Sequence, residues 1–225
     1  MILIGGCSNF DKNYYTKEGL DVVVWTDKIK TKNINVSGAG YSNLQIKDAV
    51  MNTIIQNKHN IEHVYVFWSE WSRIGNPYVA QYHDYLNNSL SIKKWILSNE
   101  KFGEEDIHHN QLIDTNLNIF IAMESFLNQH KIPYTFYQTL EPFHFRDTEH
   151  EYEFTRQLIK KPQFNHITWD NFWGWPMSES LNGNTLYSYM KNQLDEIAVS
   201  KTNPHMNQKA HDFLANNMVD NRLKL

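Results

Sequence analysis

The stretch Met1-Ile2-Leu3-Ile4-Gly5-Gly6-Cys7-Ser8-Asn9-Phe10 decides the fold. Three apolar residues, two glycines and a short polar pair are typical of a buried strand that ends in a tight turn. In a parallel α/β sheet, the loop after the first strand lies outside the carboxyl ends of the strands, where ligands bind. Ser8 therefore has two interpretations, as a serine that satisfies backbone groups in a turn or as a nucleophile.

The composition is that of a globular chain with one core. The chain has 225 residues, of which 41% are hydrophobic, and this length favours a single domain over residues 1–225. The net charge is −4 and no run of Lys or Arg stands out, so we expect no nucleic-acid partner.

The cysteine count and the apolar runs bear on location. One cysteine excludes an internal disulfide framework and predicts a reducing compartment. No apolar run is long enough for a membrane span, and Met1 leads into the first strand without a basic region. We therefore expect a cytoplasmic protein without a signal peptide. The oligomeric state stays open.

Strand and helix patterns alternate along the chain. Further strands are expected at 33–37, 64–68 and 133–137, the second of them buried on both faces because Val64-Tyr65-Val66-Phe67-Trp68 is continuously apolar. Residues 11–21 and 169–176 are expected to be loops, and 139–168 a surface excursion with a short helix near 152–159. Helices are expected at 22–29, 44–55, 77–99, 113–129, 185–197 and 207–219. This alternation predicts a single three-layer α/β/α domain with a flavodoxin-like, doubly wound parallel sheet.

The loops after the first three strands carry glycine or serine, and a histidine precedes the last helix. In a doubly wound sheet these loops converge at one edge. Nucleophilic acyl transfer needs such a set, because a serine must meet a histidine that takes its proton and donors that bind the oxyanion.

On these residues the chain resembles the SGNH hydrolase family, also called GDSL-type esterases. Gly6-Cys7-Ser8 is similar to the family's Gly-Asp-Ser block, and Gly40 to the glycine after the second strand. Thr202-Asn203-Pro204-His205-Met206-Asn207 is similar to its Asp-x-x-His-Pro-Asn block. The resemblance implies that Ser8 attacks an ester carbonyl, that His205 is the general base, and that the amides of Ser8 and Gly40 bind the oxyanion.

The chain also departs from the family pattern. Thr202 stands where the family has its aspartate, and Asp170 or Glu70 are candidates for the missing acid. The third block, usually Gly-x-Asn-Asp, is replaced by Trp68-Ser69-Glu70-Trp71-Ser72-Arg73, so Ser69 or Ser72 is expected to donate to the oxyanion in place of the asparagine. Losing one such donor costs about 2.7–4 kcal/mol of transition-state stabilisation.

Four residues are candidates for substrate binding, namely Trp68, Arg73, Trp173 and Trp175. Tryptophans in the loop 169–175 can stack on a sugar or fold over the active edge. Arg73 can hold a carboxylate or a sugar hydroxyl, or it can form a surface ion pair. The histidines lack a metal-ligand pattern, and we expect neither a metal nor another cofactor.

The sequence thus predicts a serine hydrolase that cleaves a carboxylic ester, such as an acetyl ester on a carbohydrate. The substrate would be a small molecule or a glycan. One alternative is a catalytically impaired member that acts as a glycan-binding or assembly module, which a Ser8–His205 separation above about 5 Å with no carboxylate near His205 would favour. Another is a nucleotide or phosphate binder using the loops 5–10 and 38–43, although neither loop matches a phosphate-binding fingerprint.

Overall fold

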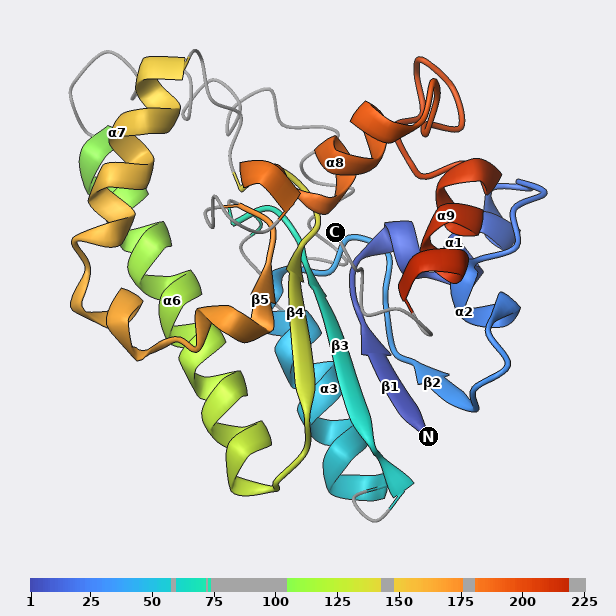
Figure 1. Cartoon of the computed structure of the whole chain (residues 1–225), viewed down its shortest axis with the longest axis horizontal. Coiled ribbons are helices and arrows are strands. Elements are labelled where there is room, and N and C mark those ends of the chain that lie inside the picture. The colour runs from blue at the N-terminus through green and yellow to red at the C-terminus, as the bar shows by residue number, and fades with distance from the viewer. Residues whose placement is uncertain (58–59, 72, 74–104, 143–147, 176–180, 219–225) are drawn as a thin grey trace.

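Five parallel strands form the sheet of the computed structural model (Figure 1), in the order β2-β1-β3-β4-β5. The structure describes residues 1–57, 60–71, 73, 105–142, 148–175 and 181–218. The strands are β1 Ile2–Gly5, β2 Asn33–Asn35, β3 His63–Trp68, β4 Tyr134–Gln138 and β5 Phe172–Trp173. This is a common order of doubly wound sheets, and its switch point lies between β1 and β3. The predicted α/β class with a parallel sheet is confirmed.

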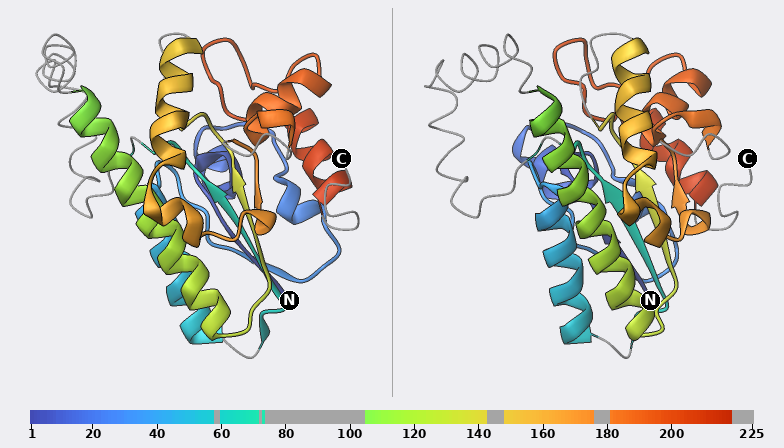
Figure 2. Two further views of the ribbon diagram at one scale, coloured as in Figure 1. Left: turned by 60° about the vertical axis from the view of Figure 1, so that its left-hand side comes forward. Right: turned by 90° about the vertical axis from the view of Figure 1, so that its left-hand side faces the viewer.

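Helices pack on both faces of the sheet. The described helices are α1 Lys12–Lys17, α2 Trp25–Lys28, α3 Asn43–Asn57, α6 Glu105–Gln129, α7 Thr148–Ile159, α8 Leu186–Gln193 and α9 Gln208–Met218. Short 3₁₀ helices are η1 Ser8–Phe10, η3 Pro162–His166, η4 Trp169–Asn171 and η5 Leu181–Gly183. Figure 2 shows α3 and α6 side by side along one face, and they contact each other. The other face is covered by residues from α2, α8 and α9.

The two faces carry separate cores because strand side chains alternate. Leu3 and Val66 pack with α3 and α6, whereas Ile4 and Phe67 pack with α8 and α9. Close packing of α3 on β1 requires the glycine at position 5, since a Cβ there would lie 2.3 Å from Cγ2 of Val50. The glycine that ends β1 is therefore set by helix packing as well as by the turn.

Two segments that the sequence analysis predicted to be loops form a helix and a strand. Residues 12–17 form α1, since the Asp11 side chain accepts a hydrogen bond from the amide of Asn13 and caps the helix. Phe172 and Trp173 form the edge strand β5, because Phe172 pairs with Phe136 and is buried against α6.

The predicted helix at 22–29 is reduced to the single turn of α2. The helix predicted at 77–99 lies outside the described residues.

The prediction of a strand buried on both faces over residues 64–68 is wrong at Tyr65, and the strand also begins one residue earlier, at His63. His63 and Tyr65 are only half-buried, while Val64, Val66, Phe67 and Trp68 are buried. The face that carries His63 and Tyr65 is thus incompletely roofed at the amino end of the strand.

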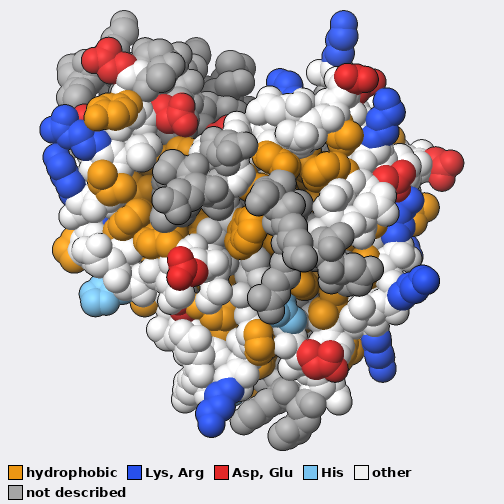
Figure 3. Space-filling model, in the orientation of Figure 1, with side chains coloured by type: hydrophobic (Ala, Val, Ile, Leu, Met, Phe, Trp, Pro, Cys, Tyr) orange, Lys and Arg blue, Asp and Glu red, His pale blue; other side chains and the backbone are white. Residues whose placement is uncertain are grey.

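The face of the molecule drawn in Figure 3 carries charges of both signs. In Figure 3, Lys/Arg and Asp/Glu side chains are interspersed mainly around the rim of one face, and hydrophobic side chains lie nearer its middle. Among the helices that the structure describes, none has the length and apolar character needed to cross a bilayer.

Candidate active site

Ser8 and His205 meet at the carboxyl edge of the sheet. The turn after β1 places Ser8 at the start of η1, and His205 lies in the loop that leads into α9. The Oγ atom of Ser8 is 2.8 Å from Nε2 of His205, although 197 positions separate the two residues in the chain. This is hydrogen-bonding distance for a nucleophile and its base. The pair lies beside the β1/β3 switch point, where a doubly wound sheet binds ligands.

The side chain of Asn203 fixes the tautomer of His205. Its Oδ1 atom is 3.2 Å from the backbone nitrogen of His205 and 2.7 Å from the ring atom Nδ1. A backbone N–H only donates, so the asparagine atom facing it is the oxygen and not the amide nitrogen. The same oxygen therefore accepts a hydrogen bond from Nδ1–H, which leaves the lone pair of Nε2 directed at the Ser8 hydroxyl. This is the tautomer that a general base requires.

The imidazole is held from its face as well. The ring of Tyr14, from α1, stacks on it with 4.0 Å between centroids, and its hydroxyl is 2.9 Å from Nδ1. Burial lowers the pKa of His205 below its ordinary value of 6.5, and the positive charge of Arg73 lowers it further, with Glu18 acting in the opposite direction. His205 is consequently neutral, and able to accept a proton, at neutral pH.

Asn9 and Tyr15 join the nucleophile loop to the histidine loop. The Oδ1 atom of Asn9 accepts a hydrogen bond from the amide of Met206 at 3.0 Å. The hydroxyl of Tyr15 donates to the carbonyl of Met206, also at 3.0 Å. Asn9 follows Ser8 and Met206 follows His205, so these bonds hold the two reacting side chains in register.

Gly40 lies in a turn that is attached to the nucleophile loop. The amide of Gly38 donates to the carbonyl of Gly6, and the amide of Ala39 donates to Oδ2 of Asp11. Gly40 has φ of +73°, as the third position of a type II turn requires. Within the described part of the chain, neither its amide nor that of Ser8 donates a hydrogen bond to another residue. Both amides can therefore serve as oxyanion donors.

Ser69 follows β3 on the other side of the switch point. Its amide donates to Oδ1 of Asn43 at 2.7 Å, and its carbonyl accepts from Nε2 of Gln138 at 3.1 Å. Its Oγ is buried and has no hydrogen-bond partner among the residues that the structure describes. The backbone of Ser69 is thus fixed, but its side chain is fully buried, so its accessibility does not support the predicted role of its hydroxyl as an oxyanion donor. Ser72, the other serine considered, lies outside the described residues.

An asparagine is present here after all, but it has a structural role. Asn43, at the start of α3, is buried and donates through Nδ2 to Oδ1 of Asn116 at 2.7 Å. Asn116 in turn donates to the carbonyl of Trp71. The Asn43 Nδ2 group also donates to the carbonyl of Ser69 at 3.4 Å, and its Oδ1 accepts from the Ser69 amide. Within the described part of the chain, both Nδ2 protons are therefore occupied, and Asn43 supports the loop after β3 rather than donating to a substrate.

The acids suggested for His205 lie elsewhere. Glu70 forms an ion pair with Arg73 at 3.0 Å, and Asp170 lines a pocket formed by β3, β4 and the segment before β5. Thr202 is exposed and bonds to Ser200. Among the described residues, the ring nitrogens of His205 contact only Ser8, Asn203 and Tyr14. The orienting group is therefore the Asn203 amide, a residue that the sequence interpretation passed over because the family pattern places the acid three positions before the histidine.

Three tryptophans were candidates for substrate binding, and two of them belong to the core. Trp68 is fully buried against Phe120 and Phe136, and Trp175 is 4% exposed and packs on Trp71. Neither ring is accessible to a substrate, so these assignments are wrong. Trp173 is half-buried and lines the same pocket as Asp170, away from Ser8.

Arg73, the fourth candidate for substrate binding, is half-buried and near enough to lower the pKa of His205.

No protein-family model matches this chain, and no curated protein matches it. Within the described segments, no group of three or more His, Cys, Asp and Glu side chains is arranged to hold a metal ion. The case for a function accordingly depends on the geometry of the site.

Proposed function

We propose that this protein is a serine hydrolase of the SGNH type that cleaves a carboxylic ester. The observation that carries the proposal is the 2.8 Å contact between Ser8 Oγ and the unprotonated Nε2 of His205. The 2-1-3-4-5 strand order and the position of this contact at the switch point support it.

The reaction follows from the placement of the proton. His205 Nε2 takes the hydroxyl proton of Ser8 as Oγ attacks the ester carbonyl, and the amides of Ser8 and Gly40 stabilise the oxyanion. The protonated His205 then gives this proton to the leaving alcohol. A water molecule, deprotonated in turn by His205, attacks the acyl-serine; His205 then returns this proton to the Oγ of Ser8 as the acyl–serine bond breaks and the acid is released.

A glycan-binding module without catalysis is the second candidate. It is favoured by one observation, namely that an amide rather than a carboxylate orients His205. The short Ser8–His205 distance favours the enzyme, since a binding module has no need to keep this hydrogen bond. An asparagine also orients the histidine of papain-like proteases, so the amide is compatible with turnover.

The substrate that we propose is a small acyl ester. Ser8 is only 6% exposed, and this limited access favours an acetyl group over a long acyl chain. A carbohydrate is the alcohol that we expect, because its hydroxyl groups suit the polar side chains around the pair.

The test is labelling with a fluorophosphonate probe, together with hydrolysis of p-nitrophenyl acetate and of an acetylated sugar. Wild-type protein should be labelled and should hydrolyse the esters, and Ser8→Ala and His205→Ala should lose both properties. Ser125→Ala, at an exposed serine of α6, is the matched control and should behave as wild type. Absence of labelling and of hydrolysis in folded wild-type protein would overturn the proposal and leave the binding module.

A further inference from the structure

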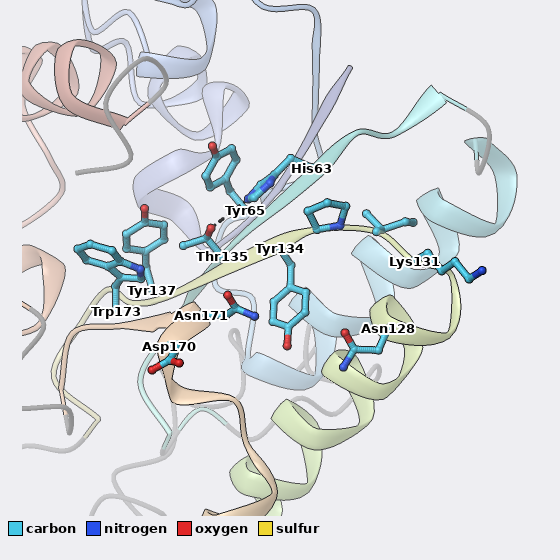
Figure 4. A pocket seen from close by; sticks show the side chains of 12 residues that line it. His63, Tyr65, Asn128, Lys131, Tyr134, Thr135, Tyr137, Asp170, Asn171 and Trp173 are labelled. Carbon is cyan, nitrogen blue, oxygen red and sulfur yellow. Dashed lines mark hydrogen bonds between the residues drawn. The ribbon is translucent and has the colours of Figure 1, made fainter. Parts of the chain in front are cut away.

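A second site lies on the sheet face that the helices leave open. A pocket of about 380 Å³ is formed by β3, β4, β5 and the segments just before β4 and β5 (Figure 4). Its volume falls in the range of about 300–1,000 Å³ that is typical of small-molecule sites. Ser8 and His205 do not line this pocket, so it is separate from the candidate active site.

The sequence of the strands explains why this face is open. Positions 63, 65 and 135 point to the same face and carry His, Tyr and Thr, which are less apolar than Val64, Val66 and Phe136 on the opposite face. Amphipathic side chains of this kind tolerate water and need no helix to cover them. The residue types on this face of β3 and β4 therefore explain why a pocket forms there.

Aromatic rings form one end of the pocket. Trp173 and Tyr137 are neighbours on β5 and β4, with 6.5 Å between ring centroids, and Tyr65 stands on β3 beside His63. Figure 4 shows these rings around the upper and left parts of the pocket. They offer flat apolar surfaces of the size of a sugar ring.

Polar side chains that both donate and accept hydrogen bonds form the rest of the lining. Asn128, Asn171 and Thr135 are of this type, and Thr135 is 3.0 Å from Nε2 of His63. One acid and one base, Asp170 and Lys131, balance each other in formal charge. The lining therefore selects neither an anion nor a cation, and it suits a ligand covered with hydroxyl groups.

Tyr137 adds a polar group to the aromatic end of the pocket. Its side chain is 2% exposed and lines the pocket. A tyrosine hydroxyl can both donate and accept a hydrogen bond, so it can pair with a hydroxyl group of a bound ligand.

We propose that this pocket binds a neutral saccharide, with the sugar ring against Trp173 and Tyr65 and its hydroxyl groups on Thr135, Asn171 and Tyr137. A pyranose has apolar C–H faces and hydroxyl edges, which match the aromatic and polar parts of the lining. The inference does not depend on the proposed ester hydrolysis, because no residue is shared between the two sites.

Calorimetric titration with four neutral trisaccharides, namely maltotriose, cellotriose, mannotriose and triacetylchitotriose, tests the inference. At least one should bind the wild-type protein with a dissociation constant of about 1 mM or lower, equivalent to about −4 kcal/mol. Trp173→Ala should weaken that binding at least tenfold. Tyr152→Ala, which removes an aromatic ring 70% exposed on α7, should leave it unchanged.

Two further variants keep the test decisive. Thr135→Val preserves the shape of a strand residue and should weaken binding while melting as wild type does. Ser8→Ala should bind the saccharide unchanged whether or not the esterase proposal holds. Failure of all four trisaccharides to bind, equal binding by folded Trp173→Ala, or tighter binding of adenosine monophosphate than of any saccharide would overturn the inference.

Discussion

At the scale of single residues, Asn203 decides how His205 works. An orienting carboxylate does two things in a catalytic triad, because it selects the histidine tautomer and it stabilises the imidazolium that forms. The Asn203 oxygen, placed by the backbone amide of His205, performs the first task at 2.7 Å from Nδ1. It carries no charge and so contributes less to the second.

Replacing Asn203 by aspartate should therefore improve catalysis. A carboxylate beside Nδ1 favours the charged imidazole and raises the pKa of His205, which burial and Arg73 hold below 6.5 in the native protein. The acidic limb of the pH profile of kcat/KM should move to higher pH, and kcat on the plateau should rise roughly tenfold or more. Ester hydrolysis measured from pH 4 to pH 9 gives both quantities.

Asn203→Ala is the matched comparison for this prediction. It removes the acceptor without supplying a charge, so kcat should fall by about 10²-fold or more as the tautomer is released. An aspartate variant whose pH profile superimposes on that of the native protein would show that Asn203 does not act on His205.

At the scale of elements, the site depends on two loops from opposite ends of the chain. The loop between β1 and α1 carries Ser8, and the loop before α9 carries His205. Asn9 joins them through the amide of Met206, and Asn9 is itself only 4% exposed. Asn9 touches neither reacting atom and is a positioning residue.

Asn9→Ala should lower kcat more than it raises KM. The substitution leaves the Met206 amide unpaired, which costs about 1–3 kcal/mol of stability, and a displacement of about 1 Å between nucleophile and base can cost about 10²-fold in rate. Steady-state kinetics separate the two parameters. Asn118→Ala, at an exposed position of α6, should change neither, and an Asn9 variant that alters KM alone would refute the positioning role.

Some helices and strands could be predicted from the sequence, and others could not. The buried strand at Ile2–Gly5 and the long helices α3, α6 and α9 were predictable because their apolar periodicity is strong. The two-residue strand β5 was not, since its existence depends on the pairing of Phe172 with Phe136, far apart in the chain. Trp68 looked like a ligand contact for the same reason, because residue type alone does not reveal that Phe120 covers it.

The residues of the candidate site also differ in whether local sequence could predict them. Ser8, Gly40 and His205 were predicted from short motifs in the sequence, whereas Asn203 was not. Its role depends on a tight turn in which Ser200 and Asn203 exchange backbone hydrogen bonds and aim the amide back at His205. That geometry has no signature in residue spacing.

At the scale of the whole molecule, a buried chain of hydrogen bonds ties α9 and α2 to the site. His211 on α9 is fully buried, and its Nδ1 faces the amide of Trp25 at 3.4 Å. Its Nε2 is 3.1 Å from the hydroxyl of Tyr15, which donates to the carbonyl of Met206. Since the Trp25 amide can only donate, Nδ1 accepts, and the proton of neutral His211 lies on Nε2.

This arrangement should make the protein less stable in acid. Burial lowers the pKa of His211 to about 4; the positive charge of Lys28 adds to this effect, and Asp212 opposes it. In the unfolded chain the side chain takes up a proton below its ordinary value of 6.5, so between pH 6.5 and pH 4 the unfolded state binds more protons. The free energy of unfolding should therefore fall as the pH falls, by about 2 kcal/mol from this residue between pH 7 and pH 5.

Urea unfolding at pH 7 and at pH 5 measures this contribution. His211→Gln should be less stable than the native protein at pH 7, because packing and hydrogen bonds are lost, but it should lose about 2 kcal/mol less on acidification. His166→Gln, at an exposed histidine of η3, should keep the native pH dependence. An equal loss of stability on acidification in the His211 variant and the native protein would mean that His211 takes up a proton as readily in the fold as in the unfolded chain, and the assignment of Nδ1 as acceptor from the Trp25 amide would then be wrong.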